Sequence, residues 1–381
     1  MKLGLEVFLE KYLDDYKEKR VGLVTNPTGV NQRLESNIDL FFKHLNLTAL
    51  FSPEHGIRAD AKEGEKVSSS VDEVTGLPVY SLYGKTRRPS ADMLENVDVM
   101  IFDIQDIGSR YYTFIYTLAY VMAACKEHQK EVIVLDRPNP IGGVKVEGNL
   151  VHQDFTSFVG LYPIPNRHGM TIGELAHLFN EEYSIFCSLK VIPMEGWARS
   201  KLYDELDLPW VPPSPNVTGL SMQLLYPGTC LIEGTNLSEA RGTVRPFEMV
   251  GAPFIHAREL ANHFNTLELE GVIARPVSFT PTYQKYQGEK CYGVQLHVMN
   301  RHNIRPVQVG VHLLHLIYQM YSDEMEFVGN EQLKHPFFDL LAGSNELREA
   351  IIHSQIDRCL KNMRNGLESF LPIREKYLIY N

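Results

Sequence analysis

The sequence has few cysteines and no block of positive charge. Five cysteines are scattered over 381 residues without a CxxC pair, so the sequence predicts neither a disulfide framework nor a cysteine-based zinc site. The formal net charge is −10, whereas nucleic-acid binding needs clustered lysine and arginine. We therefore predict no nucleic-acid partner.

The sequence also lacks a long hydrophobic run. The longest apolar-rich stretch, YTLAYVMAAC at 116–125, is well short of the roughly 20 residues that a membrane-spanning helix needs. The first 20 residues are charged and amphipathic, unlike the continuous apolar core and small-residue cleavage site of a signal peptide. These features predict no membrane span. They predict a cytoplasmic protein, unless the chain is a trimmed form of a secreted or periplasmic one.

Common catalytic and nucleotide-binding motifs are missing as well. GxGxxG, GxSxG and HExxH do not occur. The GKT at 84–86 is similar to the end of a phosphate loop, but Val79 occupies the position of the first glycine of that motif. We therefore predict no nucleotide cofactor and no metal in the mechanism, and the serine esterase and zincin classes are disfavoured.

The first part of the chain alternates short apolar runs with helical patterns. The runs are rich in β-branched residues and almost continuously apolar, as expected of strands that are buried on both faces. They lie at 20–25, 47–52, 97–105, 131–136 and 189–194, and the helical patterns lie at 37–45, 113–130 and 170–183. This alternation predicts an α/β fold with a mostly parallel sheet and helices on both faces.

The character of the sequence changes near residue 210. Residues 210–219 and 226–248 are rich in proline, glycine, asparagine and threonine, which predicts long ordered loops. A helix at 256–264, strands at 272–281 and 292–299 and further helices are expected after them. We therefore predict two domains, at residues 1–245 and 246–381, of which the second is a smaller α+β domain.

Polar residues follow four of the predicted strands. Ligands of open parallel sheets bind beyond the carboxyl ends of the strands, so we expect the four clusters to line one cleft. Helix caps and Asx turns are the alternative for any single residue among them. The clusters are Asn26 to Gly29, then Glu54, His55 and Arg58, then Asp103, Asp106, Arg110, Tyr111 and Tyr112, and last Asp136, Arg137 and Asn139.

Carboxylates, arginines, amides and tyrosines suit a polar, hydroxyl-bearing and anionic ligand. Hydrolysis of a sugar is the chemistry that most directly needs two carboxylates across one bond. Composition and spacing leave two other classes open. One is a saccharide-binding module without activity, and the other is an esterase or amidase that uses His55 with a metal.

Several long motifs resemble those of the exo-β-N-acetylmuramidases, once known only as a domain of unknown function. They are FSPEHGIR, SLYG, FDIQDIGSRYYTF, VLDRPNPIGG, GMTIGELA, WVPPSPN, YPGTCLIEGTN, RGTVRPFE and GAPFI, and they run almost from end to end. The resemblance implies release of N-acetylmuramic acid from the non-reducing end of peptidoglycan fragments such as MurNAc-β-1,4-GlcNAc. It also implies a Rossmann-like N-terminal domain, a smaller C-terminal domain and an active-site cleft between them. The expected partner is therefore a peptidoglycan-derived saccharide.

Three carboxylates are candidates for catalysis. Glu54 is the first candidate for the general acid, because a glutamate beside the apolar LFSP can be partly buried and kept protonated. Asp103 and Asp106 compete for the role of base or nucleophile. The alternative for Glu54 is that it caps the turn that follows.

The lactyl carboxylate of muramic acid needs a cation, and a planar guanidinium suits a planar carboxylate. Asparagine amides can bind sugar hydroxyls or the N-acetyl group, and a tyrosine ring can lie against the apolar face of a sugar. Each of these residues can instead tether a loop or hold a turn. The predicted substrate-binding residues are His55, Arg58, Arg110, Tyr111, Arg137, Asn139, Asn216, Asn236 and Arg241.

Overall fold

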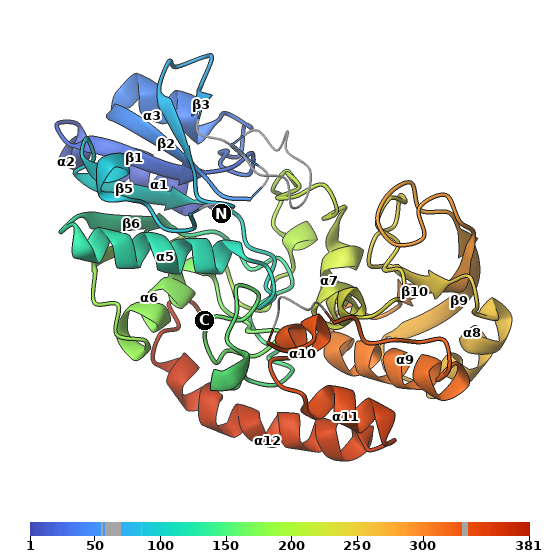
Figure 1. The fold of residues 1–381 in the computed structure, drawn as a ribbon. Coiled ribbons are helices and arrows are strands. Elements are labelled where there is room, and N and C mark those ends of the chain that lie inside the picture. The colour runs from blue at the N-terminus through green and yellow to red at the C-terminus, as the bar shows by residue number, and fades with distance from the viewer. Residues whose placement is uncertain (55, 58–69, 85, 330–333) are drawn as a thin grey trace.

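The computed structural model describes residues 1–54, 56–57, 70–84, 86–329 and 334–381. The first half of the chain forms a seven-stranded sheet in the order β3-β4-β2-β1-β5-β6-β7 (Figure 1). Every neighbouring pair is parallel except β3 with β4. The strands are β1 (Arg20–Thr25), β2 (Asn46–Ser52), β3 (Ser70–Val71), β4 (Pro78–Ser81), β5 (Val99–Asp103), β6 (Glu131–Leu135) and β7 (Ser188–Ile192). The predicted parallel sheet is confirmed.

Helices cover both faces of this sheet, which explains why its central strands are apolar without alternation. α1 (Gly4–Lys11) and α3 (Asn37–His44) lie on one face, and α5 (Phe114–Glu127) and α6 (Ile172–Glu182) lie on the other (Figure 1). All five residues of β5 are buried. The shorter helices are α2 (Leu13–Tyr16), α4 (Ala91–Leu94), η1 (Gln153–Phe155) and η2 (Tyr203–Glu205).

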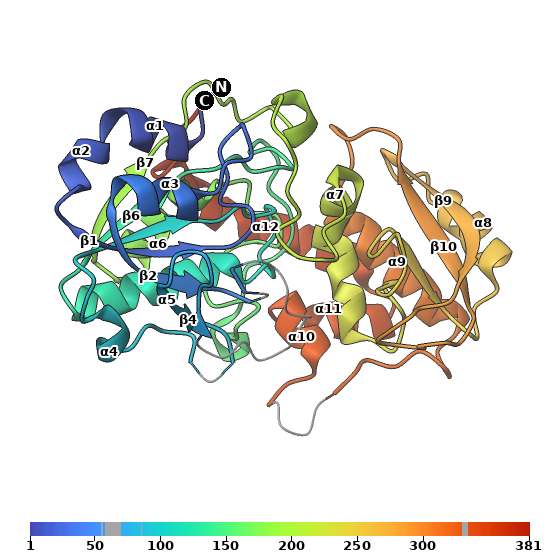
Figure 2. The same cartoon turned by 90° about the horizontal axis from the view of Figure 1, so that it is seen from above.

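The second half contains a three-stranded antiparallel sheet in the order β8-β10-β9. Its strands are β8 (Met249–Ala252), β9 (Val272–Phe279) and β10 (Cys291–Val298), and its helices are α8 (Ala257–Asn265), α9 (Pro306–Met320), α10 (Phe337–Ala342), α11 (Glu346–Ile352) and α12 (Ile356–Glu375). This is the smaller α+β part that the sequence predicts, and the predicted division at residue 245 falls in the loop before β8. α12 returns to the first half, where the Arg374 guanidinium donates to the carbonyl of Gly169 at 2.7 Å. Met1 and Tyr380, at or next to the two chain ends, pack against the same small hydrophobic cluster in the first half (Figure 2).

Helical structure extends into the second of the two stretches that were expected to form loops. α7 (Leu220–Thr229) lies between the two halves and continues into η3 (Cys230–Gly234) (Figure 2). α7 includes Pro227 and Gly228, which have poor helix propensity. A Cβ atom on Gly228 would lie 1.8 Å from the carbonyl oxygen of Pro306, so only glycine permits this close crossing of α7 and α9. The loop prediction is wrong for residues 226–234, because tertiary packing overrides local propensity there.

None of the helices in the described part of the chain is long and apolar enough to cross a membrane.

Candidate active site

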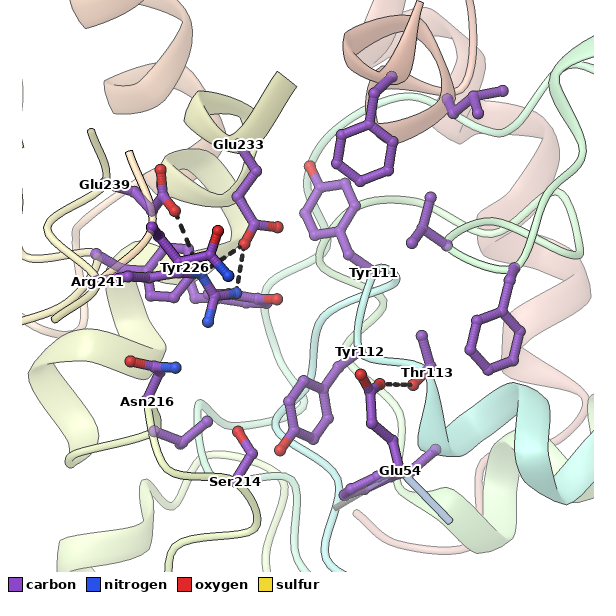
Figure 3. Close-up of a pocket in the computed structure, with 18 of the residues that line it drawn as sticks. Glu54, Tyr111, Tyr112, Thr113, Ser214, Asn216, Tyr226, Glu233, Glu239 and Arg241 are labelled. Carbon is purple, nitrogen blue, oxygen red and sulfur yellow. Dashed lines mark hydrogen bonds and ion pairs between the residues drawn. The ribbon is translucent and has the colours of Figure 1, made fainter. Parts of the chain in front are cut away.

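A cavity of about 620 Å³ lies between the two halves of the molecule (Figure 3). This volume is within the usual range of small-molecule sites. The first half contributes Glu54 and the consecutive residues 111–114, and the second half contributes Tyr226, Glu233 and Arg241 among others. We call this cavity the interdomain pocket.

One wall of the interdomain pocket carries Glu54. This residue follows β2 by two positions and is half-buried. The Thr113 hydroxyl, at the start of α5, donates to Glu54 Oε2 at 3.4 Å (Figure 3). The first turn of α5 is a favourable place for a negative charge. The carboxyl end of β2 and the beginning of α5 thus position Glu54 together.

The opposite wall carries two more carboxylates and two cations. Arg241 Nε donates to Glu233 at 3.0 Å and lies 3.2 Å from Glu239, and Arg241 Nη2 also contacts Glu233. The ammonium group of Lys285 lies 3.0 Å from Glu239. The charges on this wall therefore compensate one another (Figure 3).

Glu233 is the more accessible of these two carboxylates. Its side chain is 18% exposed, against 4% for Glu239. Glu233 Oε2 accepts only a weak hydrogen bond from the Cys230 thiol, at 3.5 Å, among the described residues. Burial, followed by the negative charge of Glu233, raises the pKa of Cys230 well above its usual range, so the thiol keeps its proton. Glu233 therefore has one oxygen available to a ligand.

A tight turn presents Arg241 to the interdomain pocket. Ala240 has φ +62° and Gly242 has φ +77°. A Cβ atom at Gly242 would lie 2.7 Å from the backbone nitrogens of Thr282 and Tyr283, so glycine is required at this position. The guanidinium carbon of Arg241 lies 4.9 Å from the ring centroid of Phe247, which fixes its direction further.

Aromatic rings form the apolar surface of the interdomain pocket. Tyr111 and Tyr112 meet Tyr226 edge to face, with centroids 6.2 and 6.3 Å apart. The Tyr111 hydroxyl donates to the carbonyl of Pro227 at 3.0 Å and accepts from the side chain of Asn166, so the ring is held in place. Burial raises the pKa of Tyr111 and of Tyr226. Such rings suit the C–H face of a sugar.

Asn216 also lines the interdomain pocket, together with Ser214 (Figure 3). The Tyr283 hydroxyl donates to Asn216 Oδ1 at 2.9 Å. This contact joins the loop before α7 to the loop between β9 and β10.

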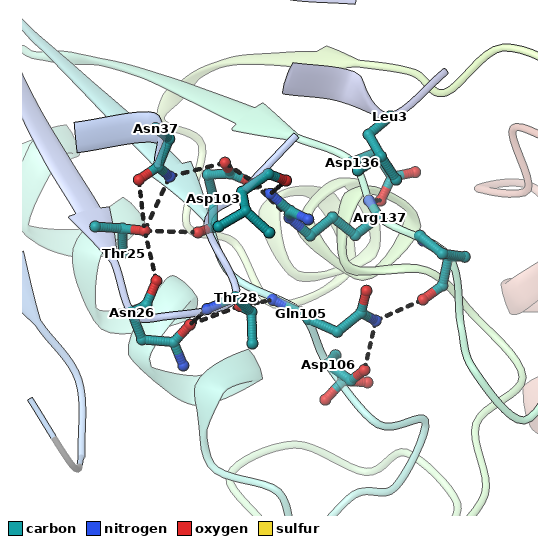
Figure 4. Close-up of polar contacts among 12 residues, drawn as sticks. Leu3, Thr25, Asn26, Thr28, Asn37, Asp103, Gln105, Asp106, Asp136 and Arg137 are labelled. Carbon is teal, nitrogen blue, oxygen red and sulfur yellow. Dashed lines mark hydrogen bonds and ion pairs between the residues drawn. The ribbon is translucent and has the colours of Figure 1, made fainter. Parts of the chain in front are cut away.

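A second polar cluster, the strand-end network, lies at the carboxyl ends of β1, β5 and β6 (Figure 4). It consists of Thr25, Asn37, Asp103, Asp136 and Arg137. Asp103 is 0% exposed and accepts from Arg137 Nη2 at 3.0 Å, from Arg137 Nε at 2.5 Å and from Asn37 Nδ2 at 2.8 Å. Neither Asp103 nor Arg137 lines the interdomain pocket, because each satisfies the other inside the protein.

Asp106 and Arg110 are also buried away from the interdomain pocket. Asp106 Oδ2 accepts from the Gly108 amide at 2.8 Å and lies 3.4 Å from His168 Nε2. Arg110 is 0% exposed and donates to three backbone carbonyls, those of Asn149, Ile164 and Leu341. Burial lowers the pKa of Arg110. The contacts are those of an Asx turn and of a loop tether.

Two predicted asparagines hold turns. Asn139 donates to the carbonyl of Met170 at 2.9 Å and accepts from the Ile141 amide at 3.1 Å. Asn236 donates to the carbonyl of Glu324 at 2.7 Å and accepts from the Glu326 amide at 3.0 Å. Neither residue lines the interdomain pocket.

The expectation that all four polar strand ends line one cleft therefore differs from the structure. The predicted residues that the pocket brings together are Glu54, Tyr111, Asn216 and Arg241. Asp103, Asp106, Arg110, Arg137, Asn139 and Asn236 lie elsewhere. His55 and Arg58 lie outside the described residues.

Three further lining residues were not predicted from the sequence: Glu233, Lys285 and Tyr226. Glu233 and Tyr226 both lie in the block YPGTCLIEGTN, so the resemblance pointed to their segment but not to the residues. Lys285 comes from a loop with no motif of its own. Among the residues that the structure describes, no cluster of three His, Cys, Asp or Glu side chains could hold a metal ion.

Comparisons with known proteins match the whole chain. Family models described as the N-terminal and C-terminal parts of exo-beta-N-acetylmuramidase NamZ match residues 21–221 and 224–380. The chain is 48% identical over 380 residues to the peptidoglycan beta-N-acetylmuramidase NamZ of Bacillus subtilis strain 168, which covers 99% of this chain and 91% of that protein.

Two crystal structures of DUF1343 family proteins from Bacteroides fragilis NCTC 9343 are also similar. One has a TM-score of 0.90 at 39% identity, and the other has a TM-score of 0.77 at 30% identity. Each alignment covers 100% of this chain and 99% of the crystallised one.

Proposed function

This chain belongs to the exo-β-N-acetylmuramidase family, and we propose that it hydrolyses the terminal glycosidic bond of peptidoglycan fragments in the interdomain pocket. The product is N-acetylmuramic acid, released from the non-reducing end of substrates such as MurNAc-β-1,4-GlcNAc. The observation that carries this proposal is the placement of carboxylates on facing walls of one cavity, with Glu54 on one wall and Glu233 on the other (Figure 3). Glycosidases use such a pair across the scissile bond.

Glu54 is the general acid in this proposal. It protonates the glycosidic oxygen while the bond from that oxygen to the anomeric carbon breaks, so the leaving sugar departs with a hydroxyl group. Water supplies the hydroxyl group that the anomeric carbon gains. Thr113, which donates to Glu54, orients the carboxyl group.

Glu233 is the second carboxylate. It forms a salt bridge with Arg241, and its Oε2 is open to a ligand. A negative charge here can activate the water or stabilise the positive charge that develops at the anomeric carbon. Glu233 thus takes the role that the sequence predicted for Asp103 or Asp106. Those two lie outside the pocket lining.

The remaining lining residues suit an N-acetylated sugar. Tyr111 and Tyr226 offer ring surface to its C–H face. Asn216 and Ser214 can bond its hydroxyl groups or its N-acetyl group.

The test is to incubate the purified protein with MurNAc-GlcNAc and, separately, with GlcNAc-MurNAc, and to identify the products by mass spectrometry. We expect free N-acetylmuramic acid from the first disaccharide and no cleavage of the second. Glu233→Gln should lower kcat by about 10²–10⁴. Glu18→Gln, which removes an exposed carboxylate outside the pocket, should leave kcat within about twofold.

Binding of the first disaccharide without cleavage would favour a saccharide-binding module instead. Cleavage of an ester or amide, lost on chelation, would favour the metal-assisted hydrolase.

A further inference from the structure

We propose that Arg87 binds the lactyl carboxylate that distinguishes N-acetylmuramic acid from N-acetylglucosamine. This inference rests on the proposed function, since it assigns the specificity of the same pocket. Arg87 is exposed and lines the interdomain pocket with Glu54. It was not among the arginines that the sequence suggested.

Of the described residues that line the interdomain pocket, three carry a lasting positive charge: Arg87, Arg241 and Lys285. Arg241 is in contact with both Glu233 and Glu239. Lys285 donates to three backbone carbonyls and to Glu239. The charges of these two are therefore already compensated by the protein.

The environment of Arg87 is different. No hydrogen bond or ion pair joins its guanidinium to another described residue of the chain. Its guanidinium carbon lies 3.8 Å from the ring centroid of Phe158. A guanidinium that lies over a ring keeps the N–H groups at its edge available, and these form the fork that binds a carboxylate through two hydrogen bonds.

Phe158 is itself held in place. It lies in a tight turn in which Ser157 and Gly160 exchange backbone hydrogen bonds of 3.0 and 3.1 Å. Its ring stacks on Tyr120 of α5, with centroids 6.4 Å apart and an interplanar angle of 23°. Tyr83 contacts the same ring at 6.3 Å. The charge of Arg87 is thus presented on a fixed aromatic support.

α5 connects this support to the proposed acid. Thr113, at the start of α5, donates to Glu54, and Tyr120 of α5 stacks on Phe158. One helix therefore helps to fix both the acid and the platform of Arg87.

The experiment measures how strongly the enzyme selects for the lactyl charge. The probes are the 4-nitrophenyl β-glycoside of N-acetylmuramic acid and its lactyl carboxamide, in which a neutral amide replaces the carboxylate. In Arg87→Gln we expect kcat/KM for the carboxylate substrate to fall by about 10- to 100-fold. The kcat/KM for the carboxamide should change little, so the ratio of kcat/KM for the carboxylate substrate to that for the carboxamide should fall. Arg87→Lys, which keeps the charge but not the fork, should give an intermediate ratio.

Arg258→Gln is the matched control, because it removes an exposed arginine on α8 that does not line the interdomain pocket. It should keep the wild-type ratio. An unchanged ratio in Arg87→Gln, or an equal fall with both substrates, would overturn the assignment. A wild-type enzyme that hydrolyses both substrates without preference would also overturn it, and the glycosidase proposal would stand. A wild-type enzyme that cleaves neither these glycosides nor MurNAc-GlcNAc would contradict the proposed function itself.

Discussion

The interdomain pocket and the strand-end network contain the same kinds of residues, yet they differ in what those residues can do. In both, an arginine lies within about 3 Å of a carboxylate: Arg241 with Glu233, and Arg137 with Asp103. Both oxygens of Asp103 accept hydrogen bonds from protein groups, and its side chain is 0% exposed. Glu233 is 18% exposed, and among the described residues only a thiol donates to its Oε2. A carboxylate becomes available for chemistry when the protein leaves its coordination incomplete beside a cavity.

The position of a carboxylate relative to the end of its strand decides whether it is enclosed by the protein or reaches the cavity. Asp103 is the last residue of β5 and pairs in register with Thr25 of β1, so its side chain is enclosed by the sheet and by Asn37. Glu54 lies two residues beyond the end of β2 and reaches the cavity. Both residues follow an apolar run in the sequence, and their positions relative to the end of the strand distinguish one from the other.

The largest expected effect is on turnover at Glu54. Glu54→Gln keeps the shape of the side chain but removes the proton that it transfers, so kcat on MurNAc-GlcNAc should fall by about 10²–10⁴. A nitrophenyl muramide has a leaving group that needs little protonation and should lose much less. The two rates are compared by product quantification and by absorbance, and the unfolding free energy should stay within about 1 kcal/mol of the wild type.

Binding of free N-acetylmuramic acid to Glu54→Gln should be preserved, because protonation does not hold the ring. Near-normal turnover of the disaccharide would show that Glu54 is structural. Equal losses on both substrates with a lower melting temperature would show the same, and both results would remove the distinction between the pocket and the network.

A substitution in the strand-end network should have the opposite effect, lowering stability and leaving turnover unchanged. Asp103→Ala leaves the buried Arg137 without its counter-ion, which should lower the unfolding free energy by about 3–5 kcal/mol. Urea denaturation measures this loss. The kcat of the fraction that remains folded should be close to wild type, because Asp103 does not line the interdomain pocket.

Replacing both partners, in Asp103→Leu/Arg137→Met, should recover part of that loss, because no buried charge is left unpaired. This double variant also remains informative if Asp103→Ala fails to fold. Normal stability with lost turnover in either variant would place Asp103 in catalysis, as the sequence first suggested.

Much of the fold could be predicted from the sequence. The predicted bounds of β1 match the structure, and those of β6 differ by one residue. This agreement is expected, because a short continuous apolar run flanked by polar residues is typical of a buried parallel strand in an α/β protein. β8 was missed because it has only four residues. α7 was missed because its Gly228, which disfavours a helix locally, is required by the close approach of the backbone of α9. That helix lies some 80 residues further along the chain.

The site was predicted less completely, for a related reason. Glu54, Tyr111, Asn216 and Arg241 were identified and do line the interdomain pocket. Arg137 was expected there as well, but its partner Asp103 lies 34 positions earlier and encloses it. Sequence shows which residue types are present at a strand end. It does not show which of them already bond one another.

Asp136, the other carboxylate of the strand-end network, introduces a dependence on pH. Its oxygens accept hydrogen bonds from Thr171 Oγ1 and the Gly173 amide, each at 2.8 Å, and from the Tyr380 hydroxyl at 2.5 Å. Burial raises the pKa of Asp136 to about 7, and the Tyr380 hydroxyl opposes this rise. Because the unfolded value is near 4, the stability that Asp136 contributes is complete below about pH 4 and is lost as the pH rises through 7.

The smallest predicted effect follows from this dependence of stability on pH. Tyr380→Phe removes a donor that matters most when Asp136 is ionised, so urea denaturation should show a loss of about 1–3 kcal/mol at pH 8 and a smaller loss at pH 5. Tyr377→Phe is the matched control. The Tyr377 hydroxyl and Lys376 lower the pKa of Glu182, so this carboxylate is ionised at both pH values and the cost should be the same at each. Turnover should be unaffected in both variants, because neither tyrosine lines the interdomain pocket. A loss in Tyr380→Phe that is equal at the two pH values would mean that Asp136 stays ionised in the folded protein. The strand-end network would then resemble the interdomain pocket in charge, and it would differ from it only in exposure.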